Sequence, residues 1–236
     1  MENDWARFTL RDLLTDCYLR QNTAAYYDIA LSYATETRAQ LEMKRSNDNN
    51  ADMFFYIIRK ANTKLGNILM TLNRFEEALF HAQEALAAAR ASKDSSYLIL
   101  SLQNVSRICL MLLNGLDIKN AEEAYNLASG QHGPEHPDVQ GAANDLITSC
   151  LGMGNFADAE RFARITYECL IDPSRELVSD ESIAIGKTQL AKVWLYTPSE
   201  QRIGGPEVAE EAETLAREAC DILEKIPRRG GSDEDM

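Results

Sequence analysis

The sequence predicts an all-α fold, a solenoid of about five antiparallel helical hairpins. Three observations support this prediction. Apolar residues recur every three or four positions along most of the chain, which is the period of one face of an α-helix. A set of small and apolar residues also repeats, shifted by 43 and then by a further 38 residues. No long stretch alternates apolar with polar residues, so we expect no β-strands.

The first two hairpins are expected at residues 8–45 and 51–92, on either side of the polar cluster at residues 46–50. The first shows a weak copy of the repeat, with Tyr27-x-x-Ala30 and Ala34 on its second helix. The second shows the clearest copy, which reads Leu65-Gly66-x-Ile68-Leu69 and then Phe75-x-x-Ala78, Ala82 and Ala85. Asn73 falls at the turn between its helices, where a left-handed backbone costs asparagine little.

The remaining hairpins are expected at residues 96–130, 138–171 and 182–226. Gly154 occupies the turn of the fourth hairpin, and an insertion at Thr197–Gly205 separates the halves of the fifth. The segment 227–236 lacks apolar periodicity, so we expect it to be disordered. The predicted organisation is an N-terminal hairpin or cap at 1–50, a repeat array at 51–226 and an acidic tail at 227–236.

Alanine recurs about every fourth residue on the second helix of each hairpin, as in Ala78, Ala82 and Ala85. Such a row gives a flat apolar stripe, across which two helix backbones can approach closely. One hairpin cannot bury this stripe alone, whereas stacking the next hairpin against it can. The pattern therefore predicts that neighbouring hairpins stabilise one another.

The charge is uneven and acidic. The chain has 24 basic and 37 acidic residues, a net charge of −13, and residues 101–236 hold 12 basic and 24 acidic ones, a net of −12. Nucleic acids and anionic membranes require local positive surface, so we expect neither as a partner. The asymmetry favours a basic or neutral protein partner, or only solubility.

Five cysteines are present, an odd number, and no two have CxxC spacing. Each lies among apolar residues, as reduced thiols in a helical core do. This usage is typical of a reducing compartment, so we expect a cytoplasmic location, with the nucleus as an alternative.

A family resemblance rests on one linker and the hairpin that follows it. The linker Gly133-Pro134-Glu135-His136-Pro137-Asp138-Val139 leads to Asn144-Asp145-Leu146 and then to Gly154-Asn155-Phe156-Ala157-Asp158-Ala159. With the alanine pattern, it resembles the tetratricopeptide repeat (TPR) family, and most closely the longer-repeat subclass of kinesin light chains. Cys109 and Ile147 depart from the family pattern, which usually has Gly or Ala at that position, as at Gly66.

The resemblance implies a right-handed superhelix in which the first helix of each hairpin lines a concave groove that binds a peptide or helix of a partner protein. Asn, Gln, Ser and Thr side chains there could hydrogen-bond an extended peptide backbone, and the cations could receive carboxylates. The alternative interpretation is a hydrated polar face without a ligand. The expected groove residues are Lys60, Thr63, Lys64, Asn67, Gln103, Ser106, Arg107, Leu110, Asn144, Thr148, Gln189 and Lys192.

Nothing in the sequence predicts catalysis, a cofactor or a metal. The chain has only three histidines, and none lies in a glycine-rich or strand–turn–helix context. His132 and His136, with Glu135 between them, could be interpreted as a metal site, but helix capping by His136 and a helix start at Pro137 explain them. We therefore expect a non-catalytic adaptor or scaffold without cofactors.

Two other roles remain open from the sequence. The chain could be a structural subunit or spacer that assembles a larger complex, a homo-oligomer among the alternatives, through edge or convex surfaces. It could also be the helical-repeat portion of a multidomain regulator, such as a SET/MYND-type methyltransferase. The candidate edge residues are Tyr26, Tyr33, Phe54, Phe55 and Tyr56.

Overall fold

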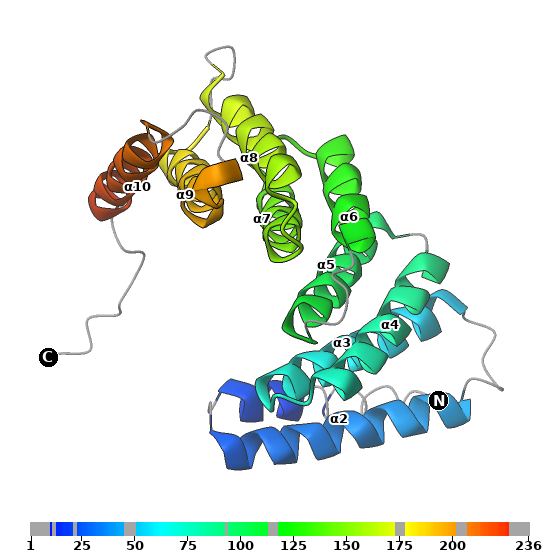
Figure 1. Ribbon diagram of the computed structural model, residues 1–236. Helices are drawn as coiled ribbons and strands as arrows, with labels where there is room; N and C mark the ends of the chain where they lie inside the picture. Colours follow the sequence, from blue (N-terminus) through cyan, green and yellow to red (C-terminus); the bar gives the residue numbers. More distant parts are fainter. Residues whose placement is uncertain are drawn as a thin grey trace, which may run out of the picture. The chain divides into compact units, whose positions relative to one another are not determined.

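The protein is all-α, as predicted. A computed structural model describes residues 10, 13–20, 23–44, 51–92, 94–112, 118–172, 178–201 and 207–226, and none of these residues lies in a β-strand. Residues 13–20 are helical. The longer helices follow in the order shown in Figure 1: α2 Ala24–Lys44, α3 Ala51–Thr71, α4 Phe75–Ser92, α5 Ser95–Leu112, α6 Ile118–Gln131, α7 Pro137–Gly152, α8 Phe156–Ile171, α9 Asp180–Tyr196 and α10 Glu207–Lys225.

The helix bounds match the ranges predicted for the last four hairpins, and α3 packs against α4, α7 against α8 and α9 against α10. The insertion in the last hairpin contains a short 3₁₀ helix, Ser199–Gln201, between α9 and α10. The polar cluster at 46–50 and the predicted disordered tail at 227–236 lie outside the described residues.

The chain forms two compact units, Met1–Ala124 and Tyr125–Met236. The first unit contains α2 to α5 and the start of α6, and the second contains the end of α6 and α7 to α10. The first hairpin, which the sequence sets apart as residues 1–50, therefore lies in the same unit as α3 and α4.

Two tight turns lie where the sequence predicts them. Asn73 has φ 58° and Gly154 has φ 72°, so both residues adopt the left-handed conformation. The amide of Arg74 donates to the carbonyl of Leu69 at 2.8 Å, and that of Asn155 donates to Cys150 at 2.9 Å. Both bonds close a Schellman motif, which satisfies the last carbonyls of α3 and α7. The turns bring α4 back against α3 and α8 back against α7.

The alanine stripes are buried in both units. Ala78, Ala82 and Ala85 of α4 are at most 3% exposed, and Ala159 and Ala163 of α8 are fully buried. A Cβ added at Gly66 would lie 3.5 Å from the carbonyl oxygen of Ala78. Small residues thus allow close helix approach within the α3–α4 hairpin, as the sequence pattern predicts.

A buried polar network joins α8 to α9 in the second unit. The indole Nε1 of Trp194, which is 2% exposed, donates to Oε1 of Glu160 at 3.1 Å. Arg164 donates its Nε to the same oxygen at 2.9 Å, and its guanidinium lies 5.0 Å from the Trp194 ring centroid. Glu160 itself is 7% exposed. The carboxylate therefore holds the two helices together from inside the unit.

Among the residues that the structure describes, no helix combines the length and the apolar character that crossing a bilayer requires.

Candidate functional site

The expected groove residues lie on α3, α5, α7 and α9, the first helices of the last four predicted hairpins. The first unit carries its share on α3 and α5, and the second unit carries the others on α7 and α9. Two of these residues, Asn67 and Asn144, are exposed to solvent. Seven others are partly buried: Lys60, Thr63, Lys64, Arg107, Leu110, Thr148 and Lys192.

In the second unit, the polar faces of α7 and α9 touch. The ammonium of Lys192 donates to the hydroxyl of Thr148 at 3.2 Å. The two residues occupy equivalent positions in consecutive repeats, 44 residues apart. Asn144 lies one helical turn before Thr148 on the same helix and is exposed. Side chains of two repeats therefore form one continuous polar row.

In the first unit, Lys64 also contacts a side chain of the preceding repeat, and this contact neutralises its charge. The ammonium of Lys64 on α3 lies 2.8 Å from a carboxylate oxygen of Asp16, and the Lys64 side chain is only 15% exposed. Asp16 occupies the position of Lys64 in the preceding repeat. The carboxylate of Asp16 therefore competes with any carboxylate of a partner for Lys64. The sequence pattern did not predict this ion pair.

Three expected groove side chains are buried rather than open to a ligand. Ser106 is 2% exposed, and Gln103 and Gln189 are each 5% exposed. Oε1 of Gln189 is buried and makes no hydrogen bond within the described part of the chain. A partner could reach these three groups only after a side-chain rearrangement, so fewer of the expected residues are accessible than the sequence predicts.

Arg59, next to the predicted Lys60, has a structural role. It is 5% exposed, and its guanidinium lies 3.5 Å from the ring centroid of Tyr97 on α5. Burial lowers the pKa of Arg59, while the electrostatic influence of Tyr97 raises it. The stack ties α3 to α5 in the first unit.

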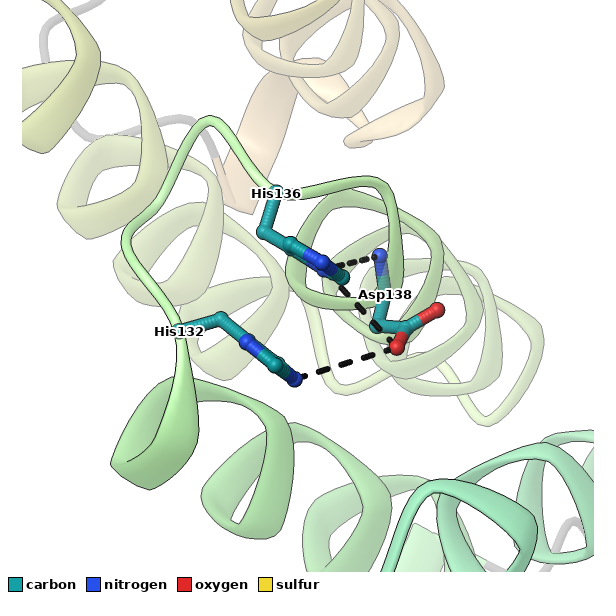
Figure 2. Close-up of side chains that lie close together, drawn as sticks. All are labelled: His132, His136 and Asp138. Carbon is teal, nitrogen blue, oxygen red and sulfur yellow. Dashed lines mark hydrogen bonds and ion pairs between the residues drawn. The ribbon is translucent and has the colours of Figure 1, made fainter.

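The linker between α6 and α7 brings together a set of ligand-type side chains (Figure 2). Nδ1 of His136 accepts the backbone N–H of Asp138 at 3.2 Å, which confirms His136 as the cap of α7, with Pro137 as its first residue. The rings of His132 and His136 stack, with centroids 3.8 Å apart and planes 9° from parallel. Oδ2 of Asp138 lies 3.7 Å from Nδ1 of His136 and 4.0 Å from Nε2 of His132.

Intramolecular packing accounts for much of the predicted aromatic edge. Tyr18 stacks on both Tyr26 and Tyr33 at centroid distances of 5.8 Å. Tyr56 meets Tyr97 edge-on at 6.0 Å, and Phe55 packs against a buried cluster. The side chain of Phe54 lies outside the described residues.

None of the five cysteines forms a disulfide. Cys150 is buried, and Cys109 and Cys169 are partly buried, as expected for thiols on core faces. Cys17 and Cys220 are exposed, which differs from the sequence expectation of burial.

No protein-family model matches the sequence, and no curated protein does. Among solved structures, the chain is similar to a putative kinesin light chain with nearly identical TPR-like repeats from Podospora anserina. The TM-score is 0.72 at 13% identity, over 94% of this chain and 97% of that one. It is also similar to BtubC (BKLC) from P. vanneervenii, with a TM-score of 0.66 at 15% identity, over 94% and 84% of the two chains. The chain therefore has the TPR-like helical-repeat fold.

Proposed function

We propose that the protein is a non-catalytic interaction module that binds an extended peptide or a helix of a partner along the polar faces of its first helices. The observation that carries this proposal is the bond from Lys192 to Thr148, because it joins the polar faces of consecutive repeats into one row. A row that runs from repeat to repeat fits a linear ligand better than a small molecule.

The exposed groups of the row match the needs of a peptide backbone. The amide of Asn144 can donate to a backbone carbonyl and accept from a backbone N–H. Asn67 offers the same chemistry on α3 of the first unit. No carboxylate among the described residues forms an ion pair with Lys192, so its ammonium can receive an acidic group of the partner.

Two of the three histidines make structural contacts, which supports a non-catalytic role. Nδ1 of His81 lies 2.9 Å from the side-chain oxygen of Asn62, and the imidazole of His136 caps α7. Neither ring is placed as a base beside a hydroxyl or thiol nucleophile in these contacts. The protein would work in the cytoplasm, which the five cysteines without disulfides support.

The test uses a peptide selected from a displayed random library on the wild-type protein, with affinity measured by calorimetry. We expect the double variant Asn67→Ala and Asn144→Ala to bind the selected peptide about 5- to 150-fold more weakly, since each lost hydrogen bond costs about 0.5–1.5 kcal/mol. Both side chains are exposed, so circular dichroism and the melting temperature should stay unchanged.

The matched control is the double variant Gln83→Ala and Asn126→Ala. It removes two exposed amides from second helices, one in each unit. This control should bind the peptide as the wild type does. Equal affinities of the wild type and of the Asn67 and Asn144 double variant would contradict the proposed groove.

A further inference from the structure

We propose that His132, His136 and Asp138 bind a divalent metal ion of the zinc class at the junction of α6 and α7. The three side chains offer one ligand atom each, and these atoms lie within 4.8 Å of one another (Figure 2). The proposal is independent of the peptide groove, because none of these residues belongs to it.

The separations suit a shared ion better than direct hydrogen bonds. Oδ2 of Asp138 lies 3.7 Å and 4.0 Å from the two imidazole nitrogens, beyond hydrogen-bond distance. Two bonds from one zinc ion to nitrogen or oxygen ligands span up to about 4.1 Å. An ion between the carboxylate and either imidazole therefore reaches both atoms.

The unsatisfied nitrogen of His132 points to the same conclusion. Its Nε2 is buried and makes no hydrogen bond within the described part of the chain. A buried ring nitrogen without a hydrogen bond is unfavourable, and a metal ion in front of it would provide a partner. Oδ2 of Asp138 lies 4.0 Å from this nitrogen and can supply a negatively charged ligand for the same ion.

The donor set defines the class of metal. Two imidazole nitrogens and one carboxylate oxygen are typical zinc ligands, and water can complete a tetrahedral site. Calcium and magnesium prefer oxygen ligands throughout and are disfavoured by the two histidines.

Binding requires a small local movement. In a tetrahedral zinc site, neighbouring ligand atoms lie about 3.4 Å apart, so the cluster must contract. The two imidazole rings must also tilt relative to each other. Each nitrogen lone pair lies in the plane of its ring, so the lone pairs of two parallel, stacked rings do not converge on one ion. Rotation about the last side-chain torsion of histidine is soft. When the ion binds, Nδ1 of His136 coordinates it and gives up the hydrogen bond that it accepts from the backbone N–H of Asp138.

The ion would connect two helices. His132 directly follows the last residue of α6, while His136 and Asp138 form the start of α7. A metal bound to all three therefore fixes the linker at 132–136 and raises the melting temperature, as any ligand of the folded state does.

The experiment measures binding of Zn²⁺ by calorimetry and of Co²⁺ by visible absorption on the full chain. We expect one equivalent of metal with nitrogen and oxygen ligands. His132→Ala and Asp138→Asn should each weaken binding by at least about tenfold, since even loss of a residue that only supports a ligand costs about 10–100-fold. His136→Ser should weaken it equally while keeping a capping oxygen for α7, which separates ligation from folding.

Two control variants address other donors. His81→Ala removes the histidine of the first unit, and Cys169→Ser removes a thiol that lines a cavity of about 170 Å³ together with His132. Both should bind metal as the wild type does. Absence of stoichiometric binding, unchanged binding by His132→Ala, or a Co²⁺–thiolate band that Cys169→Ser abolishes would each overturn the assignment.

Discussion

An Ile147→Ala variant is expected to lose about 2–5 kcal/mol of unfolding free energy, the usual cost of such a truncation in a packed core. Ile147 lies on α7 and is 1% exposed, so its side chain fills interior space. The TPR family usually has glycine or alanine at this position. Substitution by a family's usual residue commonly stabilises a protein. Here we expect the opposite, a loss of stability, because the Ile147 side chain fills interior space.

The matched control is Gly66→Ala, at the equivalent position of α3. The added methyl would lie 3.5 Å from the Ala78 carbonyl oxygen and 3.8 Å from the Ala82 amide, both ordinary contacts. Alanine also favours the helix over glycine by about 1 kcal/mol, so this variant should be as stable as the wild type or more stable. Urea unfolding followed by circular dichroism measures both variants. A stable Ile147→Ala protein would show that α7 and α8 close together without this side chain.

A Glu160→Ala variant is expected to lose about 2–3 kcal/mol of unfolding free energy. The change leaves the indole N–H of Trp194 buried without an acceptor, and it removes the partner of Arg164. A buried donor left unsatisfied costs about 1–3 kcal/mol, and the lost charged contact adds to this. Because the Arg164 side chain is 45% exposed, loss of its ion pair contributes less to this cost than the unsatisfied indole N–H does.

Glu160→Gln separates the two contributions. Its amide oxygen can still accept from Trp194 but carries no charge, so the expected loss is only about 1 kcal/mol. The measurement is thermal unfolding followed by circular dichroism. Equal stability of the alanine and glutamine variants would contradict the role of the indole hydrogen bond.

The helices could be predicted from the sequence because their signals are local. The alanine rows gave the hairpins, and Asn73 and Gly154 marked turns whose left-handed backbone the structure confirms. His136 was correctly interpreted as a helix cap, because capping depends on residues only two positions apart.

The candidate site was less predictable, because it depends on packing between repeats. A helix pattern does not show that Ser106 and Gln103 are covered by neighbouring side chains. The pair of Asp16 and Lys64 joins residues 48 positions apart, and it follows only once the weak first repeat is aligned with the second. The cluster of Asp138 with two histidines depends on the conformation of a linker that no periodic pattern describes.

The most direct test of the interaction module is a map of backbone amide shifts in solution during titration with a selected peptide. The account predicts perturbed signals along the first helices, at Asn67, Asn144 and Lys192, with the signals of Gln83 and Asn126 unchanged. Perturbations confined to the second helices, or none at saturating peptide, would contradict binding along the polar faces.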